Sequence, residues 1–440
     1  MSRTCDIVVV GAGPGGLAAA TAAAGGGRKV VVLDDNPDVG GQIWRAGAGR
    51  SATDSAREKV VAEFKASGAL LLAGHQVVDA TTSPGTLQAW IAAGQKAESF
   101  RFESLILATG ARERFLPFPG WTLPGVFGAG GLQALVRGGY EVRGKRVVVA
   151  GTGPLLLAVA VHLKQDGAEI VTIAEQAPIG QLAAFATALL SRPGKLLQAI
   201  RLRAELGSIP YRTGCWVLSA EGGKAVSGVR LTDGSRTWSE PCDVLACGFH
   251  LVPNTELASL LGCDVTATGV KVDTEQRTTV NSVYCAGEPT GIAGVEAALA
   301  QGRIAGLVAA GQPSAAKQLY SLRAAEARFG HAMTRAFALR PEVLQLCGPD
   351  TIVCRCEDVR FDQLRAGAMP PRNWTEAKLQ TRCGMGACQG RVCGPAVEAL
   401  FGWHNTSVRS PLFPIPLAAL CSVPPDSTDA SNLASQENRP

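Results

Sequence analysis

The sequence predicts an α/β protein with two dinucleotide-binding units and a small, cysteine-rich helical domain near its C-terminus. Three observations carry this prediction. An apolar strand runs into the glycine turn GAGPGG near the start of the chain, a related turn, GTGPLL, follows a second apolar strand, and five cysteines fall between residues 354 and 393. Such glycine turns are typical of βαβ units that bind pyrophosphates, and closely spaced thiols are typical of metal sites.

The first unit opens the chain. The run CDIVVV predicts a buried strand, after which Gly11, Gly13 and Gly16 precede a helix that starts near Pro14. Gly11 permits the tight turn, Gly13 lets the backbone approach a pyrophosphate, and Gly16 lets the helix pack on the strand, with the helix N-terminus facing the phosphates. A second strand ends at Asp34, whose carboxylate can accept both ribose hydroxyls of an adenosine.

Two later segments favour FAD over NAD in this unit. SLILATGARE places Thr109 and Gly110 after a short apolar strand, and VNSVYCAGEPTG ends another strand in Gly287 and Glu288. They resemble the A-T-G and G-D motifs of two-dinucleotide flavoproteins of the glutathione reductase and thioredoxin reductase group. The resemblance implies a contact between the ribityl chain and Glu288, which replaces the usual Asp. The residues expected to bind FAD are Gly11, Gly13, Pro14, Gly15, Gly16, Asp34, Gly41, Gln42, Thr109, Gly110, Gly287, Glu288 and Gly294.

The second unit carries an incomplete fingerprint. Gly151 and Gly153 follow a strand and Glu175 closes the next one, but Leu156 stands where the third glycine is usual. A large side chain there disfavours close packing of helix on strand, which puts cofactor entry in doubt. No arginine follows Glu175, which disfavours NADP. Three interpretations stay open: an NAD site, a site for another adenosine nucleotide, and a vestigial fold.

The C-terminal cysteines point to metal chemistry. Cys354 and Cys356 form a C-x-C pair, and TRCGMGACQGRVC carries Cys383, Cys388 and Cys393. An iron–sulfur cluster needs converging thiolates, and a glycine-rich loop lets backbone amides approach the sulfurs. A Cys₄ zinc site is the main rival, although it favours C-x₂₋₄-C pairs in both halves. Buried free thiols are the third interpretation.

The segment resembles the [2Fe–2S] domain of the bacterioferritin-associated ferredoxins, in which a C-x-C pair precedes a second close pair by about thirty residues. This resemblance implies Cys354, Cys356, Cys388 and Cys393 as the ligands and leaves Cys383 as a spare thiol. The second pair is longer here, C-x₄-C. The form GMGxCQGxxC is similar to that of anaerobic glycerol-3-phosphate dehydrogenase and of the large subunits of opine oxidase-like enzymes.

Composition narrows the function classes. The 440 residues are 46% hydrophobic with a formal charge of +5, which is too mild to indicate nucleic-acid binding. The five histidines form no triad or metal-spaced group, so a hydrolase lacks support. No apolar run has the length of a membrane span, and the N-terminus leads directly into a strand. With 13 cysteines, an odd number, we expect a reducing, cytoplasmic location.

The motifs divide the chain into seven segments. The expected order is FAD domain, connection, NAD-like domain, return to the FAD domain, helical connector, [2Fe–2S] domain, and a tail whose end is disordered. The boundaries are 1–112, 113–143, 144–250, 251–312, 313–345, 346–408 and 409–440.

This order of parts resembles the large (α) subunit of the opine oxidase, D-hydroxyproline dehydrogenase and hydrogen cyanide synthase family. The resemblance implies a complex in which a D-amino-acid-oxidase-like flavoprotein β subunit oxidises a C–N bond, and in which a further partner is a small ferredoxin-like γ subunit. This chain would then relay electrons through FAD and [2Fe–2S]. The alternatives are a self-sufficient NADH:acceptor oxidoreductase and a redox-inactive scaffold subunit.

Overall fold

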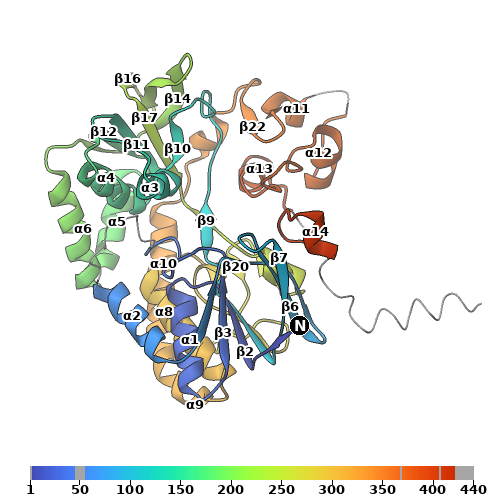
Figure 1. The fold of residues 1–440 in the computed structure, drawn as a ribbon. Helices are drawn as coiled ribbons and strands as arrows, with labels where there is room; N and C mark the ends of the chain where they lie inside the picture. Colours follow the sequence, from blue (N-terminus) through green and yellow to red (C-terminus); the bar gives the residue numbers. More distant parts are fainter. Residues whose placement is uncertain (1, 45–54, 367–368, 406–407, 422–440) are drawn as a thin grey trace, which may run out of the picture.

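The computed structural model describes residues 2–44, 55–366, 369–405 and 408–421. Figure 1 shows two sheets, one built from blue strands and one from green strands, with the orange and red C-terminal segment beside them. The expected disorder at the end of the tail concerns residues outside those that the structure describes.

The first sheet is parallel, in the order β21-β8-β2-β3-β4. Its strands are Val283–Cys285, Ser104–Leu107, Ile7–Val10, Val30–Asp34 and Leu70–Ala73. All residues of β2 and β3 are buried, as expected for a parallel sheet that is covered on both faces.

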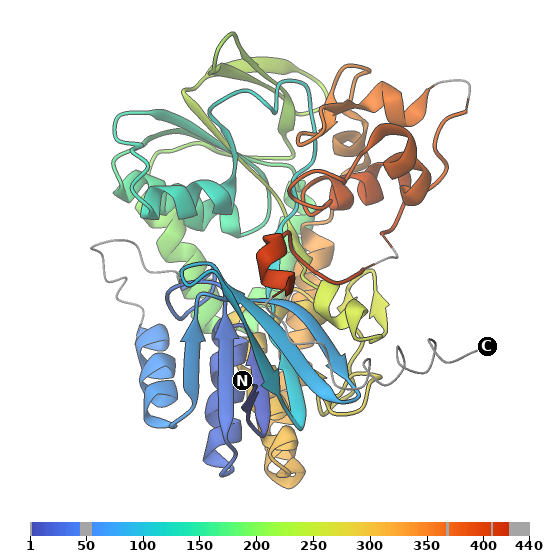
Figure 2. The ribbon, with the colours of Figure 1, turned by 45° about the vertical axis from the view of Figure 1, so that its right-hand side comes forward.

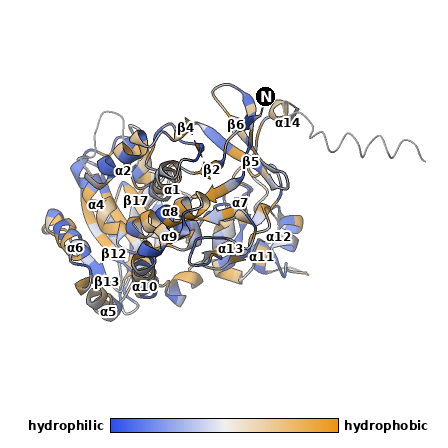
Figure 3. Ribbon diagram, turned by 90° about the horizontal axis from the view of Figure 1, so that it is seen from below, coloured by the Kyte–Doolittle hydropathy of each residue, from blue (hydrophilic) through white to orange (hydrophobic). Residues whose placement is uncertain are grey.

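Helices cover one face of this sheet and a second sheet covers the other. The helices are α1 (Pro14–Gly25), α2 (Ser55–Ala66) and α8 (Val295–Ala309). The covering sheet, β1-β7-β6-β5, comprises Arg3–Thr4, Lys96–Arg101, Gly85–Ile91 and His75–Thr82. Helices α1 and α8 meet at small residues, since a Cβ on Gly302 would lie 2.1 Å from the Gly15 carbonyl oxygen. Figure 3 shows α2 at the periphery, with hydrophilic blue and hydrophobic orange residues alternating along it.

The second parallel sheet has the order β10-β17-β11-β12-β13. Its strands are Val126–Gly128, Val244–Phe249, Arg146–Thr152, Glu169–Glu175 and Tyr211–Thr213. One face packs on α3 (Ala129–Arg137) and α4 (Leu155–Gln165). The other face packs on an antiparallel sheet of β14 (Trp216–Gly222), β15 (Val226–Thr232) and β16 (Thr237–Pro241). A helical pair, α5 (Ile179–Leu190) and α6 (Pro193–Leu206), follows β12.

The chain passes between these bodies through two short strands. β9 (Ala111–Glu113) leaves the first sheet, and β18 (Leu251–Pro253) returns to it, pairing antiparallel with β9. The return continues through α7 (Glu256–Leu260), β19 (Val265–Thr266), β20 (Gly269–Val270) and the 3-10 helix η1 (Glu288–Thr290). The second dinucleotide fold is therefore inserted between two segments of the first.

A helical connector leads to a small C-terminal domain. The connector contains α9 (Pro313–Ala316), η2 (Lys317–Leu319), α10 (Tyr320–Ala336) and η3 (Pro341–Gln345). The C-terminal domain contains β22 (Ile352–Cys354), β23 (Val359–Arg360), α11 (Phe361–Arg365), α12 (Trp374–Thr381) and α13 (Cys393–Phe401). Helix α14 (Leu417–Cys421) then lies beside the blue strands of the covering sheet in Figure 2. Leu412 packs in the core of the first body, so the segment after the domain straps back onto it.

Candidate cofactor sites

The first glycine turn forms a close-fitting backbone cradle at the carboxyl end of β2. Gly11 has φ +106°, and a Cβ there would lie 2.2 Å from the Ala108 carbonyl oxygen. Gly41 faces Gly13, because a Cβ on Gly41 would lie 3.0 Å from the Gly13 Cα. Helix α1 starts at Pro14 and has no acidic residue in its first turn. The cradle therefore fits a pyrophosphate, which backbone amides and the helix N-terminus would bind.

Asp34 lies buried at the end of β3 and points into this cradle. One carboxylate oxygen accepts from the Ala12 amide at 2.5 Å, and the other accepts from the amide and the side chain of Asn36, both at 2.8 Å. The carboxylate is thus held at the place where an adenosine ribose lies in this type of fold.

Replacing Asp34 by alanine is expected to weaken FAD binding about tenfold or more, because unpaired ribose hydroxyls cost roughly 1–3 kcal/mol. Titrating the apoprotein with FAD, and following the quenching of flavin fluorescence, measures the effect. Asp38→Ala is the matched control, since Asp38 is an exposed carboxylate in the same loop. Equal FAD affinity in the Asp34 variant and the control would contradict the assignment.

Two more motif segments meet at the same end of the sheet. Thr109 donates from its hydroxyl to the Asn254 carbonyl oxygen at 2.7 Å, and Asn254 Nδ2 donates back to the Thr109 carbonyl oxygen at 2.9 Å. The Gly287 amide donates to Gln301 Oε1 at 2.7 Å. A Cβ on Gly15 would lie 3.6 Å from the Gly287 Cα, so the first turn and the later motif are neighbours.

Glu288 is suited to a polyol partner. Desolvation by burial raises the pKa of its carboxyl, and no hydrogen bond from the described part of the chain offsets that effect. The hydroxyls of a ribityl chain would supply such donors. Gly294 has φ +89° and caps the N-terminus of α8, whereas Gln42 is exposed. The residues present therefore fit FAD, which would supply two-electron redox chemistry at this end of the sheet.

In the second glycine turn, the missing third glycine is compensated on a neighbouring strand. Leu156 is fully buried, and the residue opposite it is Gly248 of β17, where a Cβ would lie 3.3 Å from Leu156 Cδ2. Gly151 also contacts Gly248 closely, since a Cβ on Gly151 would lie 1.9 Å from the Gly248 carbonyl oxygen. Leu156 thus fills space that Gly248 leaves open. Leu156 is therefore not what disfavours the binding of a nucleotide at this turn, and a different feature does so.

That feature is the connector, which lies against the carboxyl end of the second sheet. The Thr152 hydroxyl donates to the Phe337 carbonyl oxygen at 3.2 Å. Gln176 Nε2 donates to the Ala338 carbonyl oxygen at 2.8 Å, and Gln176 Oε1 accepts from the Arg340 amide at 2.9 Å. In a fold of this type, the pyrophosphate and the adenosine ribose lie at this end of the sheet. Residues 337–340 therefore occupy the approach to the second glycine turn.

Glu175, the acid at the end of β12, is fully buried. Its carboxylate oxygens accept from the Gly153 and Ala177 amides, each at 2.8 Å, but desolvation outweighs these bonds and raises its pKa to about 7. Because this pKa exceeds that of an unfolded glutamate, the unfolded chain loses this proton at a lower pH than the folded chain does. The contribution of Glu175 to the free energy of unfolding is therefore greatest at low pH, and it falls by roughly 3 kcal/mol as the pH rises from the pKa of the unfolded state to that of the folded state.

Glu175→Gln is expected to remove this pH dependence, although the amide loses one of the two acceptor positions. Thermal unfolding near pH 5 and near pH 8 should show a smaller difference in Tm for the variant than for the unsubstituted chain. Glu141→Gln, an exposed change in the same body, is the control. A Tm difference that is unchanged in the Glu175 variant would contradict the buried, proton-binding carboxyl.

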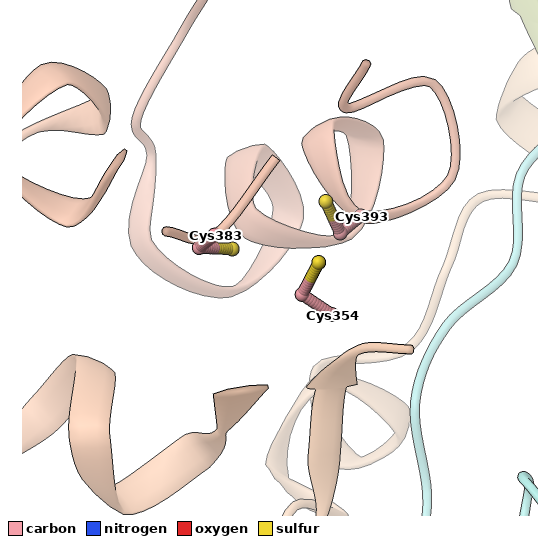
Figure 4. Close-up of side chains that lie close together, drawn as sticks. All are labelled: Cys354, Cys383 and Cys393. Atoms are coloured by element: carbon pink, nitrogen blue, oxygen red, sulfur yellow. The ribbon is translucent and has the colours of Figure 1, made fainter. Parts of the chain in front are cut away.

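Three thiols converge in the C-terminal domain. The Sγ atoms of Cys354, Cys383 and Cys393 all lie within 4.8 Å of one another, and all three residues are buried. Figure 4 shows their sulfurs facing a common point. They come from the end of β22, from the residues after α12, and from the start of α13.

The remaining two cysteines extend this group. The Cys388 thiol hydrogen-bonds with Cys393, which lowers the pKa of Cys388 to about 5, and it also contacts the Cys356 thiol. Hydrogen bonds from Cys383 and then Cys393 lower the pKa of Cys354. Of the four cysteines expected as ligands, the structure brings only Cys354 and Cys393 into the close group, whose third member is Cys383, the thiol expected to be a spare. Cys388 is linked to this group through Cys393, and Cys356 adjoins Cys388.

The loop that carries these thiols depends on glycine. A Cβ on Gly386 would lie 2.3 Å from Cys356 Cβ, and a Cβ on Gly384 would lie 2.6 Å from the Trp374 ring. The loop can thus fold tightly over Trp374 while the thiols stay together. A converging set of thiolates with few other ligands fits iron–sulfur or zinc chemistry, and hard oxygen-ligated cations are disfavoured.

The fold and these motifs define the class of two-dinucleotide flavoproteins. Residues 5–302 match the family model of the pyridine nucleotide-disulphide oxidoreductases, and the chain belongs to that family. The chain is 31% identical to the HcnB subunit of hydrogen cyanide synthase from Pseudomonas protegens, over 96% of this chain and 98% of that protein. It is also 31% identical to a subunit of opine oxidase from Agrobacterium tumefaciens, over 96% of this chain and 93% of that protein.

Solved structures share the fold. L-Proline dehydrogenase from P. horikoshii superposes with a TM-score of 0.68 at 18% identity, covering 95% of this chain and 80% of that chain. Thioredoxin reductase of T. acidophilum gives a TM-score of 0.53 at 24% identity, covering 70% of this chain and 99% of that one. None of the helices in the described ranges combines the length and the apolar character that crossing a bilayer requires.

Proposed function

We propose that the chain is the electron-transfer subunit of a multi-subunit dehydrogenase that oxidises the C–N bond of an amino acid, imino acid or opine. The observation that carries the proposal is the joint presence, in one chain, of a cradle that fits FAD and a group of three converging thiols with two further cysteines beside it. A flavin exchanges electrons in pairs or singly and a [2Fe–2S] cluster exchanges one at a time, so together they suit a relay.

In this proposal the [2Fe–2S] cluster is held by Cys354, Cys356, Cys388 and Cys393. The structure favours a cluster that reaches the surface, because Cys356 is exposed while Cys354 and Cys393 are buried. Cys383 lies close to Cys354 and Cys393 on the buried side of this group and is the alternative ligand that the described residues offer.

The C–N oxidation itself is assigned to a partner. Relatives that align over nearly their full length are named as subunits of opine oxidase and of hydrogen cyanide synthase. We propose a D-amino-acid-oxidase-like flavoprotein as the β partner and a small ferredoxin-like protein as a γ partner, in the cytoplasm. This chain would receive electrons from the β partner and pass them through FAD and the cluster.

An NADH:acceptor oxidoreductase is the second candidate, since the family to which the chain belongs is described by its pyridine nucleotide chemistry. The second glycine turn and Glu175 favour it. The hydrogen bonds of Thr152 and Gln176 to the connector oppose it, because the nucleotide would have to displace them. A redox-inactive scaffold subunit requires that the FAD cradle stay empty.

The proposed function is tested by reduction of the flavin under anaerobic conditions. The chain is purified alone and together with a co-expressed flavoprotein partner, and amino acids, imino acids and opines are added in turn. We expect bleaching of this chain's flavin only when the partner and one of these substrates are both present. Bleaching of the flavin by a substrate without the partner would contradict the assignment of C–N oxidation to the partner.

A further inference from the structure

One arginine links the flavin-side motif to the thiol loop. Arg112 lies in β9, directly after the A-T-G segment. Its Nη1 donates to Asn254 Oδ1 at 2.7 Å and lies 2.9 Å from Glu256 Oε1, and its Nε donates to the Arg391 carbonyl oxygen at 3.2 Å. Arg391 belongs to the loop between Cys388 and Cys393.

Arg391 itself ties this loop to the strap. Its Nη1 donates to the Cys388 carbonyl oxygen at 3.4 Å and its Nη2 donates to the Leu412 carbonyl oxygen at 2.6 Å. The guanidinium also stacks 4.0 Å from the centre of the Phe413 ring. Leu412 in turn donates its amide to the Val78 carbonyl oxygen at 2.8 Å, in the covering sheet of the first body. The loop is therefore fixed to the first body from two sides.

Asn254, which accepts a hydrogen bond from Arg112, connects this arginine to the A-T-G segment. Asn254 exchanges two hydrogen bonds with Thr109, and its main-chain amide donates to the Gly110 carbonyl oxygen at 3.0 Å. The chain of contacts Thr109–Asn254–Arg112–Arg391–Cys388 thus joins the carboxyl end of the first sheet to the thiol cluster. The hydrogen bonds from Thr109 to Arg391 join residues from different segments of the chain. The distance between the first sheet and the thiol loop is therefore set by tertiary structure.

We propose that Arg112 is a positioning residue that holds the loop Cys388–Cys393 against the flavin domain and thereby sets the rate of electron transfer between FAD and the cluster. This inference rests on the proposed function. Only an arginine can serve here, because its planar fork offers Nε and Nη donors in fixed directions to Asn254, Glu256 and the loop carbonyl at once. A lysine keeps the charge near Glu256 but has no Nε donor for the Arg391 carbonyl.

The experiment compares Arg112→Lys with Arg146→Lys in the chain loaded with FAD and cluster. Arg146 is the matched control because it forms a two-point pair with Asp243 in the second body. Flash photoreduction of the flavin, followed at cluster wavelengths, gives the electron-transfer rate. Hydrogen–deuterium exchange of residues 384–393 reports the order of the loop independently of activity.

For Arg112→Lys we expect normal FAD and iron content, transfer slowed about tenfold or more, and faster exchange in the loop, because transfer depends on a geometry that the fork maintains. Arg146→Lys should change neither reading. A transfer rate in Arg112→Lys equal to that of the unsubstituted chain would overturn the inference. If this variant loses its cofactors, Glu256→Gln, which removes the carboxylate that holds the Arg112 guanidinium, replaces it and must slow transfer likewise; an unchanged rate there overturns the inference too.

Different results would refute the positioning role of Arg112 and the proposed function. An unsubstituted chain that lacks FAD or cluster, or that shows no transfer between them, would refute the proposed function and the inference together. Normal transfer in the unsubstituted chain, together with an unchanged rate in Arg112→Lys, would refute the positioning role alone.

Discussion

Replacing any one of Cys354, Cys356, Cys388 and Cys393 by serine is expected to abolish the visible absorption of the cluster, whereas Cys383→Ser should retain it. Iron is bound by thiolate, and a serine hydroxyl stays protonated at neutral pH, so each ligand exchange removes a bond to the metal. Visible spectra and assays of iron and acid-labile sulfide on the five purified variants measure the result.

Among these variants, Cys383→Ser distinguishes best between the possible sets of ligands. Its sulfur lies within 4.8 Å of those of Cys354 and Cys393, as near as a ligand would be. Loss of the cluster in Cys383→Ser together with its retention in Cys356→Ser would replace the proposed set by Cys354, Cys383, Cys388 and Cys393. Retained iron and sulfide in the Cys388 or Cys393 variant would contradict both sets.

The isolated chain is expected not to be reduced by NADH. Hydride transfer needs the reacting atoms about 3–3.5 Å apart, and a nicotinamide nucleotide reaches the second turn only if residues 337–340 move away. Their hydrogen bonds to Thr152 and Gln176 oppose that movement. Anaerobic mixing with NADH, followed at the flavin absorbance maximum, is the measurement. Rapid bleaching would promote the NADH:acceptor oxidoreductase in place of the relay.

The local parts of the fold could be predicted because they depend on short-range chemistry. The order of strand, glycine turn, helix and acidic residue specifies a βαβ unit, and both units form with Asp34 and Glu175 at the ends of their second strands. The family resemblance follows from the same motifs and is confirmed by the relatives. The domain boundaries and the site residues stay predictions.

What could not be predicted depends on contacts between distant segments. The glycine that makes room for Leu156 is Gly248, which lies far away in the sequence on a neighbouring strand. The fingerprint considers only glycines within the turn, so it could not reveal this compensation. Gln176 follows the strand that ends in Glu175, but its bonds to residues of the connector carry no local signal. The same holds for Arg112 and Arg391, whose partners are brought together only by the packing of three segments.

Cofactor analysis of the anaerobically purified chain, combined with EPR spectroscopy, tests the central claim most directly. We expect about one FAD, about two irons and about two acid-labile sulfides per chain, and an EPR signal of the cluster that appears only after one-electron reduction. Zinc without sulfide in the thiol cluster, or a chain that binds neither iron nor flavin, would contradict it.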